Sequence, residues 1–176
     1  MKDYVVLVNS EDQDIGEMEK MEAHQKGVLH RAFSVFLFNS NGETLLQRRA
    51  SSKYHSPHLW TNSCCSHPRK GEGLVEAANR RLSEELGISI DLDLNLEKSF
   101  SFIYRAEFNN GLIEHELDHV LTGFIDDNDF SFNKEEVEAV CWVPMKELSL
   151  DIKKFPERYT EWFKIILNEY LNYFSL

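Results

Sequence analysis

Short stretches in which apolar residues alternate with polar ones, or run on with little interruption, predict a protein rich in β-strands. Residues 32–38 are largely apolar, so the strand predicted at 30–39 is expected in the middle of a sheet, with both faces covered. An Asn-Gly turn at 41–42 follows, and residues 43–49 are expected to return as a second strand. The same patterns predict further strands at 4–9, 60–63, 99–107, 113–125 and 137–143.

A spacing of three to four residues between apolar positions predicts helices in other parts of the chain. Apolar residues at 74, 75, 77, 78, 82 and 86 form such a stripe, and Gly87 is a typical residue just beyond a helix end. Residues 17–25 fit a short helix that ends at Gly27, and Pro144 is expected to open a short helical turn. Residues 155–174 predict an amphipathic helix.

Strands outnumber helices in this pattern, and the helices are inserted between strands. This order predicts an α/β fold of the α+β type, a mixed β-sheet sandwich flanked by helices, and not a solenoid or a doubly wound parallel sheet. The length of 176 residues suits a single domain over 1–176. Its core is expected at about 28–148, with the helix at about 155–174 packed over it as a cover.

Composition narrows the classes of partner and location. The net charge of −11 argues against a nucleic-acid partner. Three cysteines, two of them adjacent, argue against a disulfide scaffold and favour a reducing compartment. No segment resembles a secretion signal, and no stretch approaches the roughly 18 apolar residues that span a membrane. We therefore predict a cytoplasmic protein without a membrane partner, active as a monomer or a weak dimer.

The segment at residues 60–68 places two chemically active side chains close together. Cys65 and His67 are two residues apart, so in an extended segment they face the same side, whereas Cys64 faces away. The simpler interpretation of Cys65 is a buried small hydrophobic residue. Its neighbours His67, Arg69 and Lys70 favour instead a partly exposed thiol with a lowered pKa.

Histidines and glutamates elsewhere supply candidate metal ligands. Glu114 and Glu116 can present both carboxylates to one point from one strand, and Asp118 shares that face. Together with three imidazoles, these groups suit a five- or six-coordinate divalent ion better than a tetrahedral structural zinc. By spacing alone, a solvated acidic strand face and unrelated histidines remain the simpler interpretation. The candidate set is His24, His30, His67, Glu114 and Glu116.

The helix predicted at 74–86 carries a spaced set of charges. Glu72, Arg80, Leu82, Glu84-Glu85, Gly87 and Ile88 follow the spacing of the Nudix box, in which helical carboxylates hold Mg²⁺ on a diphosphate. Two positions depart from that pattern: Ser66 stands where a glycine is expected, and Arg81 stands where a glutamate is expected. The loss of a carboxylate and the gain of a cation argue against hydrolysis and suit holding a diphosphate without cutting it.

Taken together, these stretches resemble the type 1 isopentenyl-diphosphate delta-isomerases, which depend on a metal and use no flavin. The resemblance extends over roughly residues 4–165 and is most specific in the run Thr-Asn-Ser-x-Cys-x-His-Pro combined with Glu-x-Glu. It implies a Nudix-like fold. The matching stretches are 29–34, 47–49, 60–68, 80–87, 104–106 and 113–116.

The resemblance implies a role for each matching residue. Cys65 takes the place of the family's catalytic cysteine, Glu116 that of its catalytic glutamate, and Tyr104 that of the tyrosine beside it. The implied substrate contacts are Arg49, Lys53 and Arg81 on the diphosphate and Trp162 over the hydrocarbon tail. No role is implied for His55 and His58, which we expect to be loop residues.

The resemblance also implies two metal positions. The first is a five-ligand site for Mn²⁺, Mg²⁺ or Zn²⁺, held by the set already named: His24, His30, His67, Glu114 and Glu116. Glu85 matches the residue that helps to hold a second ion, Mg²⁺, on the substrate diphosphate.

The implied reaction interconverts isopentenyl diphosphate and dimethylallyl diphosphate through a carbocation, in isoprenoid synthesis. It needs a positioned acid on one face of the substrate and a base on the other, and a thiol and a carboxylate can fill these places. Two other functions are weighed against it. A Nudix hydrolase of nucleoside or other diphosphates is disfavoured by Ser66 and Arg81, and a non-enzymatic binding module would need an inert site.

Overall fold

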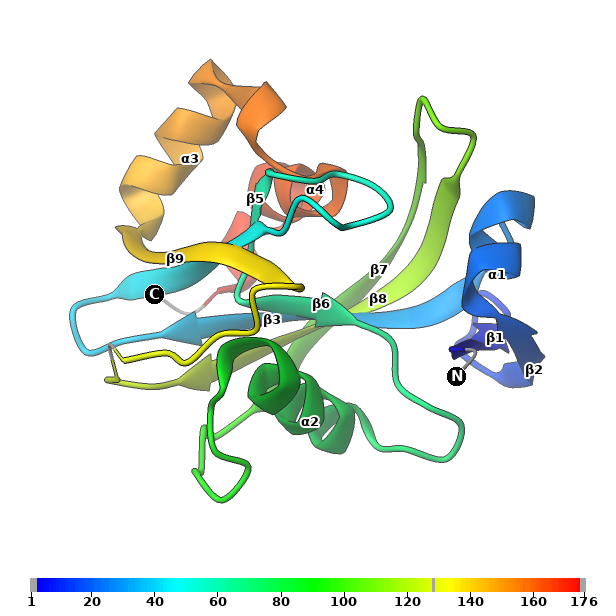
Figure 1. The fold of residues 1–176 in the computed structure, drawn as a ribbon, viewed down its shortest axis with the longest axis horizontal. Helices are drawn as coiled ribbons and strands as arrows, with labels where there is room; N and C mark the ends of the chain where they lie inside the picture. Colours follow the sequence, from blue (N-terminus) through cyan, green and yellow to red (C-terminus); the bar gives the residue numbers. More distant parts are fainter. Residues whose placement is uncertain (1–2, 128, 175–176) are drawn as a thin grey trace.

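A computed structural model describes residues 3–127 and 129–174, which form nine strands of one sheet and four α-helices (Figure 1). The strands are β1 Tyr4–Val8, β2 Asp14–Glu19, β3 His30–Phe38, β4 Glu43–Arg49, β5 Trp60–Thr61, β6 Cys64–Ser66, β7 Glu97–Glu107, β8 Ile113–Phe124 and β9 Val137–Pro144. The helices are α1 Lys20–Lys26, α2 Leu74–Leu86, α3 Met145–Lys154 and α4 Glu161–Glu169, with short 3₁₀ turns η1 Pro156–Arg158 and η2 Leu171–Tyr173. The predicted α+β class with a mixed sheet is confirmed.

Strand β3 is the centre of the sheet, as its apolar run predicts. It pairs in parallel with β8 along its whole length and antiparallel with β6, and β8 pairs antiparallel with β7. The register sets His30 opposite Glu116 on one side of β8 and Tyr104 opposite Glu116 on the other. Because side chains alternate between faces, this register decides which residues of three strands share one site.

Two apolar cores cover the two faces of β3. Phe33, Val35 and Leu37 belong to a cluster with the buried side of α2, whereas Phe36 belongs to a second cluster with residues of α3 and α4. Figure 1 shows α2 on one side of the sheet and α3 and α4 on the other. The alternation of buried side chains along β3 therefore produces the predicted sandwich.

Helix α2 spans the predicted residues, and its C-terminal end is fixed by Gly87. That glycine has φ 71°, a left-handed conformation that side chains disfavour. A Cβ added there would lie 2.7 Å from the carbonyl oxygen of Ser131, so the helix end also packs too closely for any side chain. The end of α2 is thus anchored against the segment that leads into β9.

Three local predictions are wrong. Residues 17–25 divide into β2 and α1, because 14–19 pair with β1 before Glu19 caps the helix with its carboxylate. The stretch at 60–63 is only a two-residue strand, followed by the separate strand β6. The long helix at 155–174 is broken into η1, α4 and η2, because Tyr159 forms a β-bridge to Trp60 and Thr160 N–H donates to the Trp60 carbonyl oxygen.

Within the described residues, no helix combines the length and the apolar character that crossing a membrane requires.

Candidate active site

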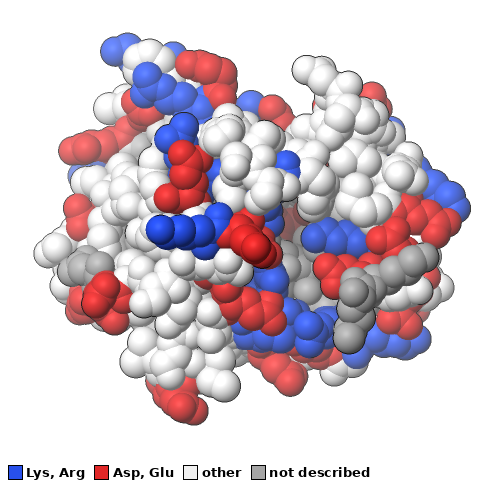
Figure 2. Space-filling model, viewed as in Figure 1, with Lys and Arg blue, Asp and Glu red and all other residues white. Residues whose placement is uncertain are grey.

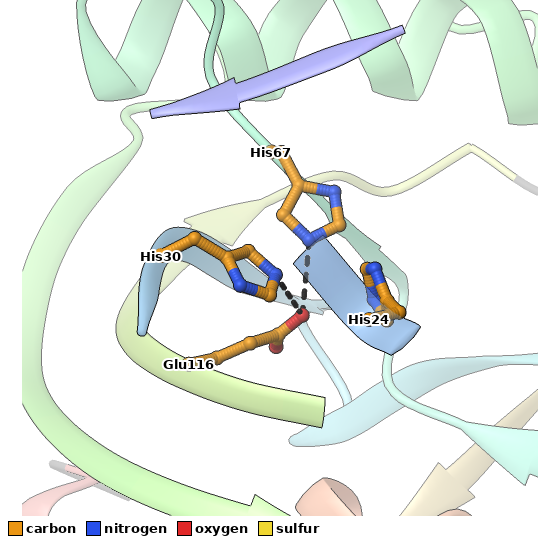
Figure 3. A group of neighbouring side chains, drawn as sticks. All are labelled: His24, His30, His67 and Glu116. Atoms are coloured by element: carbon orange, nitrogen blue, oxygen red, sulfur yellow. Dashed lines mark hydrogen bonds and ion pairs between the residues drawn. The ribbon is translucent and has the colours of Figure 1, made fainter. Parts of the chain in front are cut away.

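Four side chains from four separate segments converge on one point (Figure 3). His24 lies in the last turn of α1, His30 begins β3, His67 directly follows β6, and Glu116 lies in β8. One ligand atom from each of them falls within 4.8 Å of the others. Oε1 of Glu116 is 2.9 Å from Nε2 of His67 and 3.3 Å from Nε2 of His30. This group, which we call the His/Glu cluster, can bind a metal ion.

The local backbone turns two of these imidazoles toward the cluster. His24 Nδ1 is 2.7 Å from the Lys20 carbonyl oxygen, and His30 Nδ1 is 2.9 Å from the Val28 carbonyl oxygen. A carbonyl only accepts, so Nδ1 carries the proton and Nε2 keeps a free lone pair. Among the described residues, the buried Nε2 of His24 has no hydrogen-bond partner. Histidine metal ligands show this arrangement, so the donor set fits a divalent ion.

Burial and charge make the cluster suitable for a cation. Burial lowers the pKa of His67 to about 3 and also lowers the pKa of His24, which favours the neutral, ligating form. Burial alone would raise the pKa of Glu116, but the adjacent imidazoles of His30 and His67 outweigh it and hold that pKa well below its usual range. Glu116 is therefore an ionised carboxylate.

Glu114, the fifth predicted ligand, lies beside the His/Glu cluster but not within it. Its carboxylate instead groups with His24 and His55. The Tyr104 hydroxyl lies 2.9 Å from Glu114 Oε2 and 2.7 Å from Glu116 Oε2 and so links the two carboxylates. Burial and the charge of Glu116 raise the pKa of Glu114 to about 8.

Cys65 is enclosed by polar groups and is not activated by basic ones. Its thiol donates to Asn62 Oδ1 at 2.9 Å, and its sulfur accepts from Trp162 Nε1, also at 2.9 Å. The expected lowering of its pKa is wrong: burial and the nearby Asp118 carboxylate raise the pKa of Cys65 to about 12. The basic neighbour Lys70 is instead paired with Glu17, 3.2 Å away.

Most residues predicted for chemistry or substrate contact line one cavity of about 40 Å³. The structure brings together there Cys65, His67, Tyr104, Glu114, Glu116, Arg49, Lys53, Arg81 and Trp162. Of these, Arg49 lies with its guanidinium carbon 5.3 Å from the centre of the Trp162 ring.

A wider, charged pocket of about 380 Å³ shares Lys53, His67 and Arg81 with this cavity. Figure 2 shows basic and acidic side chains gathered around a hollow on this face of the molecule. Lys53 and Arg81 both contact Glu136, a carboxylate that the sequence did not single out. Burial raises the pKa of Glu136, but the charge of Lys53 outweighs this effect, and the pKa is lowered.

Glu85 lies on the buried side of α2 and does not line the small cavity. One carboxylate oxygen accepts from Arg81 at 2.6 Å, and the other accepts from the Gln47 side chain at 2.9 Å. Arg81 also donates to Glu84 at 2.6 Å. The arginine that departs from the Nudix pattern thus neutralises the two helical carboxylates that the pattern would devote to Mg²⁺.

Sequence reasoning missed two residues of the site. Lys20 lines both pockets, and burial lowers its pKa. Its position four residues before His24 on α1 is a helical spacing that places both on one face. His55 lies in a loop, as expected, but it is only 4% exposed and lines the small cavity. No local pattern indicated its burial.

The comparisons with known proteins agree with this geometry. A model of the NUDIX domain matches residues 28–163. A protein of Aromatoleum aromaticum named isopentenyl-diphosphate Delta-isomerase 2 is 47% identical over 176 residues, covering 100% of this chain and 90% of that protein. A protein of the same name from Photorhabdus laumondii is 50% identical and covers 96% of this chain and 92% of its own. This chain belongs to the isopentenyl-diphosphate Delta-isomerase family of NUDIX-domain proteins.

Membership of the isopentenyl-diphosphate Delta-isomerase family agrees with the family resemblance found in the sequence. The fold has more distant relatives. A Deinococcus radiodurans protein of known crystal structure superposes with a TM-score of 0.76 at 22% identity, covering 94% of this chain and 98% of that one. A MutT protein of Methanosarcina mazei gives 0.64 at 18% identity, covering 82% and 94%. At these identities the likeness shows the NUDIX fold alone.

Proposed function

We propose that this protein interconverts isopentenyl diphosphate and dimethylallyl diphosphate and so serves isoprenoid synthesis. The observation that carries the proposal is that Cys65, from β6, and Glu116 with Tyr104, from β8 and β7, line the same small cavity beside the wider, charged pocket. The names of the family members that cover nearly the whole chain support the same reaction.

The reaction moves a double bond by adding one proton and removing another. Protonation of the alkene forms a C–H bond and leaves a tertiary carbocation, and loss of a proton from the neighbouring carbon forms the new double bond. The Cys65 thiol and the Glu116 carboxylate supply an acid and a base and exchange these roles when the reversible reaction changes direction. Tyr104 holds Glu116 by its hydroxyl.

The carbocation needs stabilisation and protection from water. Trp162 is 3% exposed, lines the cavity and contacts the Cys65 sulfur through its ring nitrogen, so we assign its aromatic ring to the carbocation. A desolvated cation–π contact contributes about 2 kcal/mol. The buried side chains that wall the cavity limit the access of water that would otherwise trap the cation.

We assign the diphosphate to the wider, charged pocket. Lys53 and Arg81 line it and are proposed contacts, together with Arg49 from the adjoining small cavity. Lys20 joins them because it lines both pockets. A diphosphate would compete with Glu136 for Lys53 and Arg81. Glu85 is the proposed protein contact of a Mg²⁺ ion carried by the diphosphate.

We assign a divalent ion, Mn²⁺ with Mg²⁺ or Zn²⁺ as alternatives, to the His/Glu cluster, with Glu114 as a further ligand. An ion bound there supplies positive charge that fixes the two carboxylates and lets buried imidazoles stay neutral. No flavin is required, because the reaction transfers protons and no net electrons. The proposed location remains the cytoplasm, the oligomeric state a monomer or weak dimer, and the partner a small diphosphate.

Hydrolysis of a diphosphate is the second candidate function. Arg81 disfavours it, because a cation that pairs with Glu84 and Glu85 stands where the hydrolase pattern has a further glutamate, which leaves less carboxylate charge for catalytic Mg²⁺. Proton NMR of purified protein with isopentenyl diphosphate in D₂O, with Mg²⁺ and Mn²⁺, tests both functions. We expect dimethylallyl diphosphate with incorporated deuterium, and no product after EDTA treatment. Release of phosphate without isomerisation would favour the hydrolase instead.

A further inference from the structure

His55 is a buried histidine that no part of the proposed reaction uses. It lies in the loop between β4 and β5, at 4% exposure, and its ring lines the same cavity as Cys65 and Glu116. Histidine in a surface loop is usually exposed, so a packing or chemical reason is needed for its burial.

The ring of His55 faces one metal-ligand candidate directly. Its Nε2 lies 2.9 Å from Oε1 of Glu114, while Oε2 of the same carboxylate accepts from the Tyr104 hydroxyl at 2.9 Å. His55 and Tyr104 therefore each contact a different oxygen of the Glu114 carboxylate. A carboxylate restrained in this way has a fixed orientation toward its neighbours.

The other ring nitrogen of His55 sets which atom carries the proton. Nδ1 lies 3.3 Å from the Ser56 hydroxyl oxygen, and a hydroxyl can donate to it. An ionised Glu114 carboxylate only accepts, so the proton of the neutral ring lies on Nε2 and points at Glu114, and the Ser56 hydroxyl donates to Nδ1. Ser56 has φ 49°, a left-handed conformation that side chains seldom adopt. The backbone thus holds this serine beside the ring at some cost in strain.

Aromatic contacts fix the plane of the ring. His55 stacks on Phe108 with ring centres 4.7 Å apart and planes 16° apart. The edges of Tyr54 and Trp162 complete the surroundings, at 4.5 Å and 5.9 Å between centres. The Arg49 guanidinium donates to the His55 carbonyl oxygen at 3.2 Å. The loop, the tip of the β7–β8 hairpin and α4 together leave the imidazole little freedom.

We propose that His55 is a positioning residue, which donates a hydrogen bond from Nε2 to Glu114 and holds that carboxylate in the orientation the metal centre requires. The proposal rests on the metal centre proposed above. Partners that hydrogen-bond to ligating carboxylates orient them, and their loss typically weakens metal affinity about 10- to 100-fold. His55 and Tyr104 form such a pair on the two oxygens of Glu114.

Mn²⁺ binding to the apo protein tests the proposal without any substrate, so the result is independent of isomerisation. His55→Phe keeps an aromatic ring but removes the donor, and it should weaken Mn²⁺ binding about 10-fold or more. His55→Gln keeps an N–H donor and should restore most of the affinity. Ser56→Ala removes the hydroxyl that fixes the tautomer and should give an intermediate loss. His58→Gln, on an exposed histidine of the same loop, is the matched control and should bind as wild type.

The electron paramagnetic resonance spectrum of bound Mn²⁺ gives a readout that a loss of packing alone would not change. We expect a spectrum altered by His55→Phe and close to wild type in His55→Gln. In the isomerase assay, His55→Phe should lower kcat and leave KM for the diphosphate substrate within about twofold.

Three outcomes would overturn the proposal. The first is wild-type Mn²⁺ affinity in both His55→Phe and Ser56→Ala. The second is two Mn²⁺ ions per wild-type chain and one in each His55 variant, because His55 would then be a ligand together with His24 and Glu114. The third is the absence of Mn²⁺ binding by the wild type. If His55→Phe does not fold, the comparison of His55→Gln and Ser56→Ala with wild type decides the question.

Discussion

Trp162 and Cys65 are 97 residues apart in the chain, yet the indole N–H donates to the thiol sulfur at 2.9 Å. This contact joins helix α4 to strand β6 and fixes the thiol within the cavity. The same indole N–H also lies 3.3 Å from Asn62 Oδ1, the acceptor of the thiol proton. The side chains of Trp162 and Asn62 therefore restrain where the sulfur points.

Removing the indole N–H of Trp162 should slow the reaction even when an aromatic ring still fills its place. Trp162→Phe keeps an aromatic face but removes the N–H, and one lost hydrogen bond of about 1.4 kcal/mol corresponds to about a 10-fold lower kcat. The measurement is the initial rate of dimethylallyl diphosphate formation. An unchanged rate in this variant would show that the indole N–H does not orient the thiol.

Removing either proposed proton-transfer group should abolish isomerisation. Cys65→Ala and Glu116→Gln should each lower kcat at least about 100-fold, since a positioned acid or base contributes about 10²- to 10⁴-fold. Circular dichroism and the melting temperature should show a folded protein in both. Cys141→Ala, on a cysteine outside the cavity, is the matched control and should keep its activity. Substantial turnover in either test variant would exclude that residue from the mechanism.

Metal removal should lower stability as well as activity. A ligand at about 100 times its Kd adds about 2.7 kcal/mol to the folded state, which in a chain of this size raises the melting temperature by about 5–10 °C. We expect Mn²⁺ to give this increase in EDTA-treated wild type. His30→Ala, which removes one imidazole of the His/Glu cluster, should show almost none of it. An equal increase in both proteins would place the ion elsewhere.

Acid should remove the stabilising effect of the pair formed by Glu72 and Arg80. The guanidinium donates to both carboxylate oxygens, at 2.6 and 2.9 Å, and this contact lowers the pKa of Glu72 from its ordinary 4.5. A lowered folded-state pKa stabilises the protein above the unfolded pKa, and the effect is lost as pH falls through the folded value. Glu72→Gln should therefore melt at a lower temperature than wild type at pH 6–7, and this difference should shrink below about pH 4.

Two features sharpen that experiment. EDTA in every sample keeps metal binding out of the comparison. Glu157→Gln changes an exposed carboxylate of η1 and should show no pH-dependent difference from wild type. A difference between Glu72→Gln and wild type that stays constant from pH 7 to pH 3 would contradict the ionic origin of the effect.

The sequence was most informative where apolar residues follow a clear pattern. Strand β3 is a nearly continuous apolar run, helix α2 has an apolar period of three to four residues, and both were predicted closely. The helix at 155–174 was not, because the backbone of Tyr159 and Thr160 pairs with Trp60. That pairing is a tertiary contact, and no local pattern reveals it.

In the candidate site, too, local motifs were predictive, whereas features that depend on tertiary contacts were not. Short motifs indicated the positions of Cys65 and His67, and both line the cavity. The surroundings were harder to predict. The lowered pKa expected for the Cys65 thiol was wrong because burial and the Asp118 carboxylate raise that pKa, whereas Lys70, close in sequence, pairs with Glu17. Side chains from two other parts of the chain bury His55, so the local sequence could not predict its burial.

The parallel pairing of β3 with β8 has a consequence for changes in chain length. His30, Glu116 and Tyr104 meet because three strands keep one register, so inserting a single residue into β3 or β8 would turn half of the site toward the opposite core. The segment at 88–96 lines neither site pocket, and its surface turn can accept additional residues. Residues can therefore be inserted into that turn, whereas β3 and β8 tolerate substitutions but not insertions.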